Sequence, residues 1–326
     1  MNSIISIFRN SLILYILILR CFLSYGQDTT ITTAFPFLLI NSDARSGGMG
    51  DLGVATSADA FSQYWNPAKY LFSESHSSLG FSHASYLREI GANINLSNIT
   101  FSSKGTKRGV WSGSINYFNY GQINFSKFIG DEIVNQGAGH PSEWNANLSY
   151  SLLLSERFAM GITTKYIHSN LKSFADEGNN IHSLGFDISG FHQSNELVLS
   201  RLTAVIRSGF IIANIGPRNN LDDGISKEFL PTNLRAGIGI TFLLEKNQLS
   251  FNFEASKLLV PNRVLVSPET ENEPAQYQTQ NISFISGIFK SLNDAPDGFL
   301  GEFNEVGWSF GTEYVFSKTF IFRAGS

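Results

Sequence analysis

The chain has few charged side chains and a single cysteine, and both shortages narrow the class of protein it can be. Asp, Glu, Lys and Arg make up 15% of its 326 residues, against roughly 25% in ordinary soluble domains. The net charge of −4 leaves no basic footprint for nucleic acid. Cys21 is the one cysteine and lies in an N-terminal apolar stretch. Once that stretch is removed, disulfides and thiolate chemistry are excluded, which suits an oxidising periplasm.

That N-terminal stretch predicts an export signal over residues 1–26. Arg9 supplies a positive charge before the apolar run of residues 12–19 (LILYILIL), and small residues precede the expected cleavage point. An anchor helix needs about 20 apolar residues, and Arg20 interrupts the run too early. Arg20 also stands directly before Cys21, where lipid attachment needs a small residue. We therefore expect a removed signal rather than a membrane anchor or a lipoprotein.

The rest of the chain has no second long apolar run but many segments in which polar and apolar residues alternate. In residues 109–121, Trp111, Ile115 and Tyr117 fall on one face and Ser114 on the other. Such alternation is typical of strands with one apolar face. Strands can cross a membrane only as a closed barrel, because lipid cannot pair with backbone groups. The sequence therefore predicts an all-β transmembrane antiparallel β-barrel, integral to a bacterial outer membrane; a secreted β-sandwich is the alternative.

Eleven strands are expected, joined by connections that alternate in length. The expected strands are residues 77–86, 92–103, 109–121, 143–154, 157–172, 182–192, 205–216, 233–244, 249–259, 304–316 and 319–325. The tight turns are residues 104–108, 155–156, 245–248 and 317–318, and the long connections are residues 122–142, 217–232 and 260–303. Bacterial barrels have short periplasmic turns and long extracellular loops. We therefore expect residues 260–303 to be an extracellular loop, with a short helix at Ile282–Lys290 because its apolar residues recur at helical spacing.

Two domains follow the signal in this interpretation. Residues 27–75 are rich in small residues and precede the first strand, so they are predicted to fold inside the lumen as a plug. Residues 76–326 form the barrel, in which Lys165, Glu254 and Glu313 should face the lumen because lipid excludes charge. Bacterial barrels have even strand numbers, and the chain ends inside the last expected strand, so a complete barrel is expected to continue for about three more strands.

Two patterns that match catalytic or cofactor motifs lack the context their chemistry needs. Residues 48–53 (GMGDLG) match G-x-G-x-x-G, but polar residues precede them where a dinucleotide site needs a buried strand. Ser309 matches G-x-S-x-G, but it lies in an alternating strand rather than in a sharp strand-to-helix turn. We therefore interpret the glycines of residues 48–53 as residues that allow close backbone packing in the plug. The match at Ser309 is interpreted as chance.

The six histidines show no metal-ligand spacing. His168 and His182 would face each other if their strands are neighbours, although a satisfied lumen or loop histidine is the simpler expectation. No catalytic residue, metal site or cofactor is predicted, and the chain is not expected to be an enzyme.

The segment at residues 43–70 (DARSGGMGDLGVATSADAFSQYWNPAKY) resembles the PorV family of the type IX secretion system. The motif residues carried over are Asp43, Arg45, Gly48, Gly50, Gly53, Asn66, Pro67 and Ala68. The Asn-Pro-Ala triplet is shared more widely with FadL-type barrels, where it lies in the N-terminal plug. Two later stretches are also similar to the family: residues 294–299, with Asp294, Pro296 and Phe299, and residues 311–325.

The resemblance implies a fourteen-stranded FadL-type barrel with an N-terminal plug and a role in protein secretion. Members receive secreted cargo by its C-terminal domain as it leaves the translocon, and carry it to the attachment complex at the cell surface. The implied partners are therefore cargo, subunits of the translocon and attachment complex, and outer-membrane lipid.

A loop and the lumen are the expected sites of cargo contact. The expected partner-binding loop residues are Ile282, Ile285, Phe289, Asp294, Pro296 and Phe299. An outward-facing lumen cavity would offer hydrogen bonds from Asn116, Asn252 and Glu254 to an entering cargo segment. Uptake of hydrophobic small molecules is the alternative function, and it would need an apolar lumen and a gap in a wall strand. A purely structural barrel is a third possibility.

Overall fold

The computed structural model describes residues 31–326 except residues 42, 87–92, 130–131, 172–179, 200–201, 221–226 and 268–275. The chain divides into two units, Met1–Ile31 and Thr32–Ser326, and the second is described below. The predicted signal, residues 1–26, lies outside the described residues. In the described part of the chain, no helix has the length and apolar character needed to cross a membrane.

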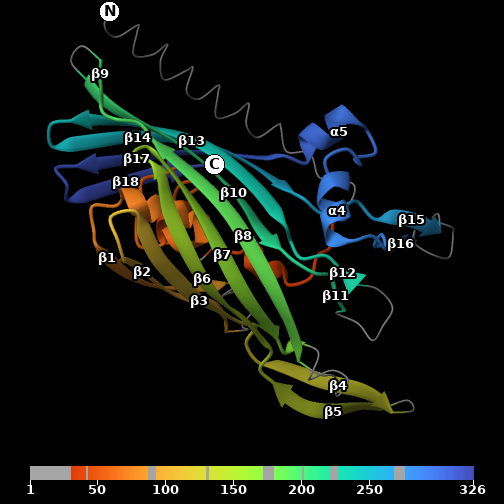
Figure 1. Cartoon of the computed structure of the whole chain (residues 1–326). Coiled ribbons are helices and arrows are strands. Elements are labelled where there is room, and N and C mark those ends of the chain that lie inside the picture. The colour runs from red at the N-terminus through yellow and green to blue at the C-terminus, as the bar shows by residue number, and fades with distance from the viewer. Residues whose placement is uncertain are drawn as a thin grey trace, which may run out of the picture. The chain divides into compact units, whose positions relative to one another are not determined.

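An antiparallel sheet of 12 strands dominates the second unit (Figure 1). Along the sheet its path runs β1 (Ser77–Tyr86), β2 (Ile94–Lys104), β3 (Gly109–Asn119), β6 (Ser142–Ser155), β7 (Phe158–Ser169), β8 (Ile181–Gln193), β10 (Leu202–Ile215), β13 (Asn233–Leu244), β14 (Asn247–Leu258), β17 (Gly307–Phe316) and β18 (Phe320–Gly325). Off this path, β9 (Leu197–Leu199) pairs with β10. Strands that follow one another along the path are neighbours in the sheet, as in an up-and-down barrel, and β1 and β18 are the two ends of the path.

All the strands expected from alternation are present on this path, with their ends shifted by a few residues. The long connections hold more structure than expected. Two-stranded hairpins form from β4 (Ile123–Ile129) and β5 (Glu132–Gly139), from β11 (Asn219–Asn220) and β12 (Lys227–Glu228), and from β15 (Val264–Ser267) and β16 (Gln276–Gln278). These strands pair only with each other and not with the main sheet, so the alternation of the barrel wall does not reveal them. The expected helix is present as α4 (Phe284–Lys290), and α5 (Phe299–Asn304) was not expected.

The two ends of the sheet differ in the connections that leave them. Tight turns such as residues 156–157 and 245–246 join strands at one end, which we call the short-turn end. The connections that contain the hairpins, α4 and α5 leave the other, which we call the long-loop end.

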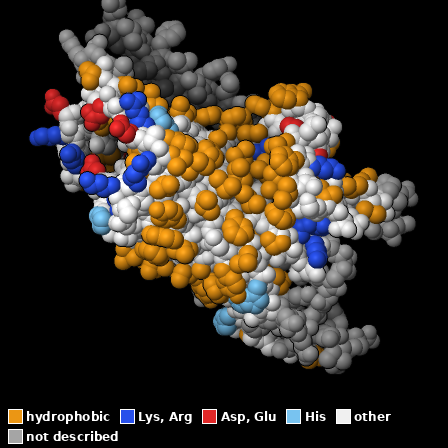
Figure 2. Space-filling model, in the orientation of Figure 1, with side chains coloured by type: hydrophobic (Ala, Val, Ile, Leu, Met, Phe, Trp, Pro, Cys, Tyr) orange, Lys and Arg blue, Asp and Glu red, His pale blue; other side chains and the backbone are white. Residues whose placement is uncertain are grey.

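The sheet is apolar on its outer face and polar on its inner face, the reverse of a soluble protein. Figure 2 shows hydrophobic side chains spread over the outer face of the strands. Exposed outer residues include Leu79, Phe81, Trp111, Ile162, Leu184, Phe253 and Phe310. On the inner face Glu254, Glu313 and Lys165 are buried, as expected, and Lys165 pairs with Asp187 at 3.0 Å. This arrangement fits a wall whose outer solvent is lipid.

Residues 32–75, which we call the inner segment, lie against the concave face of the sheet (Figure 1). The segment contains four short helices: η1 (Pro36–Leu39), α2 (Ala44–Gly47), α3 (Ser62–Trp65) and η2 (Pro67–Phe72). Asp43 caps α2 by accepting the Arg45 N–H at 2.8 Å. Asn66 caps η2 by accepting the Ala68 N–H at 3.2 Å, and Pro67 occupies the first position of that helix, where its missing N–H costs nothing.

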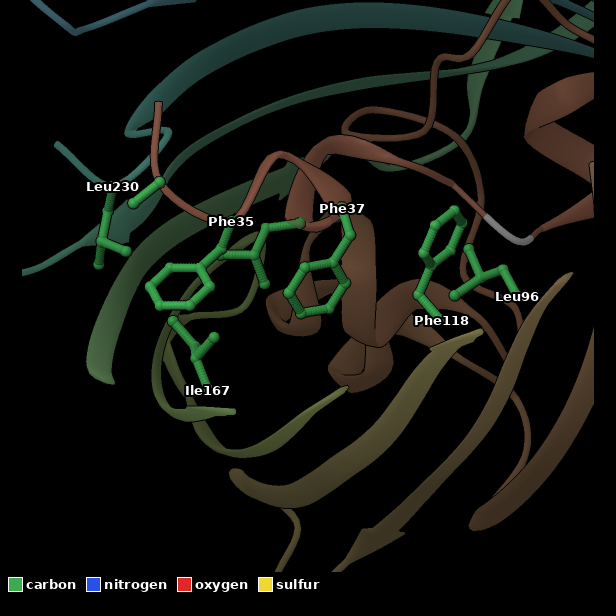
Figure 3. Packing of buried hydrophobic residues seen from close by; sticks show 8 residues of the cluster. Phe35, Phe37, Leu96, Phe118, Ile167 and Leu230 are labelled. Atoms are coloured by element: carbon green, nitrogen blue, oxygen red, sulfur yellow. The ribbon is translucent and has the colours of Figure 1, made fainter. Parts of the chain in front are cut away.

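A cluster of buried hydrophobic residues joins the start of the inner segment to the long-loop end of the wall (Figure 3). Its members are Ala34, Phe35, Phe37 and Leu38 of the inner segment, Leu96 of β2, Phe118 of β3, Ile167 of β7, and Leu230. The cluster also ties the inner segment to the connection after β10, because the Ala34 N–H donates to the Phe229 carbonyl at 2.8 Å.

This cluster leaves little free space around Asn116, where a lumen cavity was expected. Asn116 borders a cavity of about 10 Å³, together with Phe37, Asn147 and Lys165. A space of that size is just enough for one water molecule. A larger cavity, of about 960 Å³, lies between the inner segment and β1 and is lined by Arg45, Asp59, Tyr86 and Arg323 among others.

Candidate functional site

Arg45 joins the inner segment to the wall through a group of ion pairs. Its guanidinium makes two parallel bonds to Glu313 of β17, with Nε–Oε2 at 3.0 Å and Nη2–Oε1 at 2.9 Å. Nη1 donates to Asp59 Oδ2 at 2.7 Å and to the Ser57 carbonyl at 3.0 Å. Arg323 of β18 donates to the same Glu313 at 2.7 Å. Two-bond pairing of this kind is strong and fixes orientation, so it holds α2 against β17.

The charges of this group stabilise one another. Burial by itself lowers the pKa of Arg45, but the carboxylates of Asp59 and Glu313 outweigh burial and raise that pKa above its ordinary value. Burial raises the pKa of Asp59, but Lys69 and Arg45 outweigh it, so the pKa lies below its ordinary value of 3.8. Both groups are therefore charged at neutral pH.

Lys69 is a fully buried cation at the centre of the inner segment. Its Nζ donates to the Gly53 carbonyl at 2.8 Å and to Thr56 Oγ1 at 2.9 Å. Burial is the largest influence and lowers the pKa of Lys69 to about 8, although Asp59 acts to raise it. The N–H groups of this ammonium fix the turn at Gly53. Burying the charge lowers the stability of the fold, because a buried ammonium with few bonds to carboxylates is costly.

Glu254 of β14 holds the turn that follows the glycine motif. Its Oε2 accepts the N–H groups of Gly53 and Val54, both at 2.9 Å. Its other oxygen lies 3.4 Å from Nη1 of Arg235, whose guanidinium stacks over the Trp65 ring at 4.8 Å. Glu254 was expected to offer hydrogen bonds to cargo; in this structure its carboxylate already accepts two N–H groups of the inner segment.

The remaining motif residues also lie where the inner segment meets the wall. Asn66 Nδ2 donates to the Gly190 carbonyl of β8 at 2.9 Å. Ala68 is fully buried against Ala159 of β7 and Phe191 of β8. Gly50 has a φ of +75°, which favours glycine, and a β-carbon there would lie 2.7 Å from the Ser326 backbone. A β-carbon on Gly48 would lie 3.5 Å from Cβ of Arg323.

The motif therefore has a structural explanation. Asp43, Arg45, Gly48, Gly50, Gly53, Asn66, Pro67 and Ala68 all shape the inner segment or seat it against the wall. Residues 48–53 follow helix α2 and no strand delivers them, and Ser309 lies within β17, so neither motif match has the context for its chemistry. Within the described ranges, no group of three or more His, Cys, Asp and Glu side chains could hold a metal ion.

The second group of expected site residues belongs to the connection between β14 and β17. Lys257 of β14 donates to Glu302 at 2.7 Å and to Glu305 at 2.6 Å, which ties α5 to the wall. Glu302 Oε1 also accepts the N–H of Asp294 at 2.6 Å. Asp294 in turn accepts the Asn262 N–H at 2.9 Å. These bonds fix both ends of the loop, so Asp294 is a structural residue.

Helix α4 is seated on the connection after β10. Gly287 of α4 faces Phe229, and a β-carbon on it would lie 2.7 Å from the ring. Arg218 covers that ring at 4.8 Å from its centroid and donates to the Ile282 carbonyl at 3.4 Å. Ser283 caps the helix by accepting the Ser286 N–H at 3.1 Å. These contacts seat α4 against Phe229 and Arg218.

Six large apolar side chains in or beside α4 and α5 are exposed. We call the set the apolar loop face, and it consists of Ile285, Phe289, Leu292, Phe299, Leu300 and Phe303. The most exposed are Phe299 at 81% and Phe289 at 71%. Of the residues expected from sequence, Ile285, Phe289 and Phe299 belong to this face, Pro296 is exposed beside it, and Ile282 is half-buried. Leu300 and Phe303 were missed because they lie in α5, a helix that the sequence pattern did not indicate, and Leu292 was missed because it lies just beyond the expected helix.

A family described as "Type IX secretion system protein PorV" matches residues 24–264, more than half of the chain. The chain belongs to the PorV family. It is an integral outer-membrane component of the type IX secretion system, and its predicted antiparallel outer-membrane barrel fold is confirmed. The match includes the whole inner segment and the strands as far as β14; residues 294–299 and 311–325 lie beyond it.

Solved structures similar to the chain are outer-membrane proteins. The toluene transporter TodX of Pseudomonas putida shares 11% identity at a TM-score of 0.37, with 90% of this chain and 91% of that chain covered. The outer-membrane channel DcaP of Acinetobacter baumannii shares 10% identity at a TM-score of 0.27, with 78% of this chain and 65% of that chain covered. No curated protein matches the chain.

Proposed function

We propose that this PorV-family protein binds the C-terminal domain of secreted cargo and carries it from the translocon to the attachment complex at the cell surface. The observation that carries the proposal is the apolar loop face. Soluble surfaces rarely gather exposed apolar side chains in one patch, and where they do the patch marks a binding site. A loop that faced only water would gain nothing from exposing Phe289 and Phe299.

The hydrogen bonds that hold α5 and residue 294 in place support binding rather than chance exposure. Lys257, Glu302 and Asn262 fix the two ends of the loop through hydrogen bonds of 2.6–3.0 Å. A surface that is already ordered loses little conformational entropy when a partner binds. The apolar residues can then form the dry core of an interface, and Asn293 and Asp297 beside them its polar rim.

The place of this face suits the same role. It lies at the long-loop end, and long loops are extracellular in bacterial barrels. Cargo that emerges from the translocon would meet this end. Because the hydrophobic cluster packs the inner segment against the long-loop end of the wall, the proposal places cargo contact on the loops instead of inside the barrel.

Uptake of hydrophobic small molecules is the weaker alternative. An apolar route through the lumen would have to pass a wall lined by Asn98, Asn116, Asn145, Asn147 and Lys165. These side chains are polar, and several bond to one another, as Asn147 does to Ser114 at 2.8 Å. The described lumen thus favours secretion over uptake.

The test replaces the chromosomal gene, in the bacterium that makes this protein, with full-length variants Phe289→Glu, Phe299→Glu and the double change. Val198→Glu is the matched control, because Val198 is 77% exposed but lies on β9 at the short-turn end. We expect the double variant to lose surface cargo and accumulate it in the periplasm, while outer-membrane levels of the barrel stay normal. Normal surface cargo at normal barrel levels would contradict the proposal, and slower growth on long-chain hydrophobic substrates would favour uptake instead.

A further inference from the structure

Two histidines that the secretion role does not use stand opposite each other on the outer face of the wall. His168 of β7 and His182 of β8 are direct partners in the antiparallel register. Both lie at the long-loop end of their strands, on the same face as Tyr166 and Leu184. The sequence already indicated that His168 and His182 would face each other if their strands are neighbours. The structure places the pair on the outer face of the barrel rather than in the lumen or in a loop.

The ring nitrogens of the pair converge. The two Nδ1 atoms lie 3.4 Å apart, and the ring centroids are 4.8 Å apart. That separation exceeds the 2.7–3.2 Å typical of a hydrogen bond from nitrogen. Tyr166 adds a third atom that can bind a metal ion, because its Oη lies 2.6 Å from Nδ1 of His182. Two imidazole nitrogens and one phenolic oxygen therefore point to a common region.

This spacing fits a shared metal ion. Zinc binds histidine nitrogen at about 2.0–2.1 Å in tetrahedral geometry, which puts two ligand nitrogens about 3.3–3.4 Å apart. The observed 3.4 Å needs almost no movement of the rings. The strands that carry them are held on both sides by paired residues, Ile167 with Ser183 and Ser169 with Ile181. The backbone positions both ligands before any ion arrives.

We propose that His168 and His182 bind one divalent transition-metal ion, Zn²⁺ or Cu²⁺, with Tyr166 beside it and water at the open positions. Imidazole suits both ions, and copper binds such ligands more tightly than zinc. In the described part of the chain no third histidine or carboxylate joins the pair, so this is a two-histidine site at the long-loop rim of the outer face. A bound ion would clamp β7 to β8 at the rim. The inference is independent of cargo binding.

The test is metal titration of the metal-free full chain, purified without a histidine tag in detergent. ZnCl₂ and CuCl₂ are titrated separately by calorimetry. A copper ion also quenches nearby indole fluorescence, and Trp144 lies 5.4 Å from the His168 ring. We expect one ion per chain, with binding weakened about tenfold or more in His168→Asn and His182→Asn. His76→Asn is the control, because His76 is exposed in the segment before β1, and it should bind as the unchanged chain does.

A second measurement needs no variant and so does not depend on variants that fold. Diethyl pyrocarbonate modifies accessible histidines, and peptide mass spectrometry reads each site. Zinc should protect His168 and His182 from modification and leave His76 unprotected. Equal modification of the pair with and without zinc, or unchanged affinity in both asparagine variants, would overturn the proposal.

Discussion

The ring of Trp65 occupies the space that a side chain on Gly53 would need, since a β-carbon there would lie 2.3 Å from Cγ of the indole. The same glycine donates its N–H to Glu254, so the turn cannot move away without losing that bond. We predict that Gly53→Ala lowers the free energy of unfolding by about 1–3 kcal/mol, as overpacking does. Urea unfolding in detergent measures it. Gly47→Ala is the matched control, because a β-carbon there meets nothing within 4 Å; equal stability of the two variants would contradict the prediction.

Loss of the carboxylate of Glu313 should remove one of the two carboxylates that compensate the buried Arg45 cation, and the pair with Asp59 would remain. Breaking one side of a buried pair costs about 3–5 kcal/mol, and both side chains are largely buried, at 15% and 8% exposure. We therefore expect Glu313→Gln to unfold at markedly lower urea concentration than the unchanged chain. Glu156→Gln makes the same chemical change at an exposed turn and should have little effect. If Glu313→Gln were as stable as that control, Arg45 would not be the residue that seats α2.

Asn66 should not tolerate replacement by aspartate, although the two side chains have the same shape. The carboxylate can still cap η2, but it would face the carbonyls of Gly190 and Val54 to which Nδ2 now donates. An unsatisfied buried acceptor costs about 1–3 kcal/mol, and more when it is charged. We expect Asn66→Asp to expose the inner segment to protease in the folded barrel. Asn195→Asp, at an exposed position, should leave protease resistance unchanged.

Acid should weaken the contact between Asp59 and Arg45. The pKa of Asp59 is lower in the folded protein than its ordinary value of 3.8, so the unfolded chain binds the proton first. The stabilisation from Asp59 is therefore complete above about pH 3.8 and is lost as the pH falls below it through the folded pKa. The free energy of unfolding should be measured from pH 6 down to about pH 2. At the acid end it should fall less steeply in Asp59→Asn than in the unchanged chain. An acid dependence as steep as that of the unchanged chain would show that other carboxylates control it.

Lys257 should control the loop without controlling the barrel. Lys257→Met removes both ion pairs to α5 but keeps an apolar stem of similar length. We expect faster proteolysis within residues 294–305 and reduced surface cargo. The barrel should unfold at a urea concentration close to that of the unchanged chain, because the two pairs join the loop to β14 and leave the pairing of β14 with β13 and β17 intact. Lys246→Met, in the turn before β14, is the control. Loss of barrel stability equal to that of Glu313→Gln would contradict a role limited to the loop.

The wall was predictable because its signal is local. In β3, alternation alone predicts that Trp111 lies on the outer face and Ser112 on the inner face. A charged residue such as Glu313 in an apolar strand can face only the lumen. The helix α4 was predictable for the same reason, from the spacing of Ile285 and Phe289. These features need only a short window of sequence.

The contacts of the lumen were not predictable because they join distant residues. Nothing near Glu254 indicates that it accepts N–H groups of Gly53 and Val54, about 200 positions earlier. The close packing near Asn116 was not predicted for a similar reason: Phe35 and Phe37 were interpreted as part of a small-residue plug, but they pack against Leu96, Phe118 and Ile167. The hairpins in the long connections were missed because each pairs only with itself.

The bond between Arg45 and Glu313 spans 268 positions of the chain, which bears on the order of events during biogenesis. Arg45 can pair early with Asp59, only 14 positions away, but its two-bond contact to the wall must wait for β17. Contacts of such high sequence separation form late and slowly, so α2 cannot be fixed against the wall before β17 is in place. In a nascent barrel, the inner segment would thus remain loose and protease-sensitive until β17 docks.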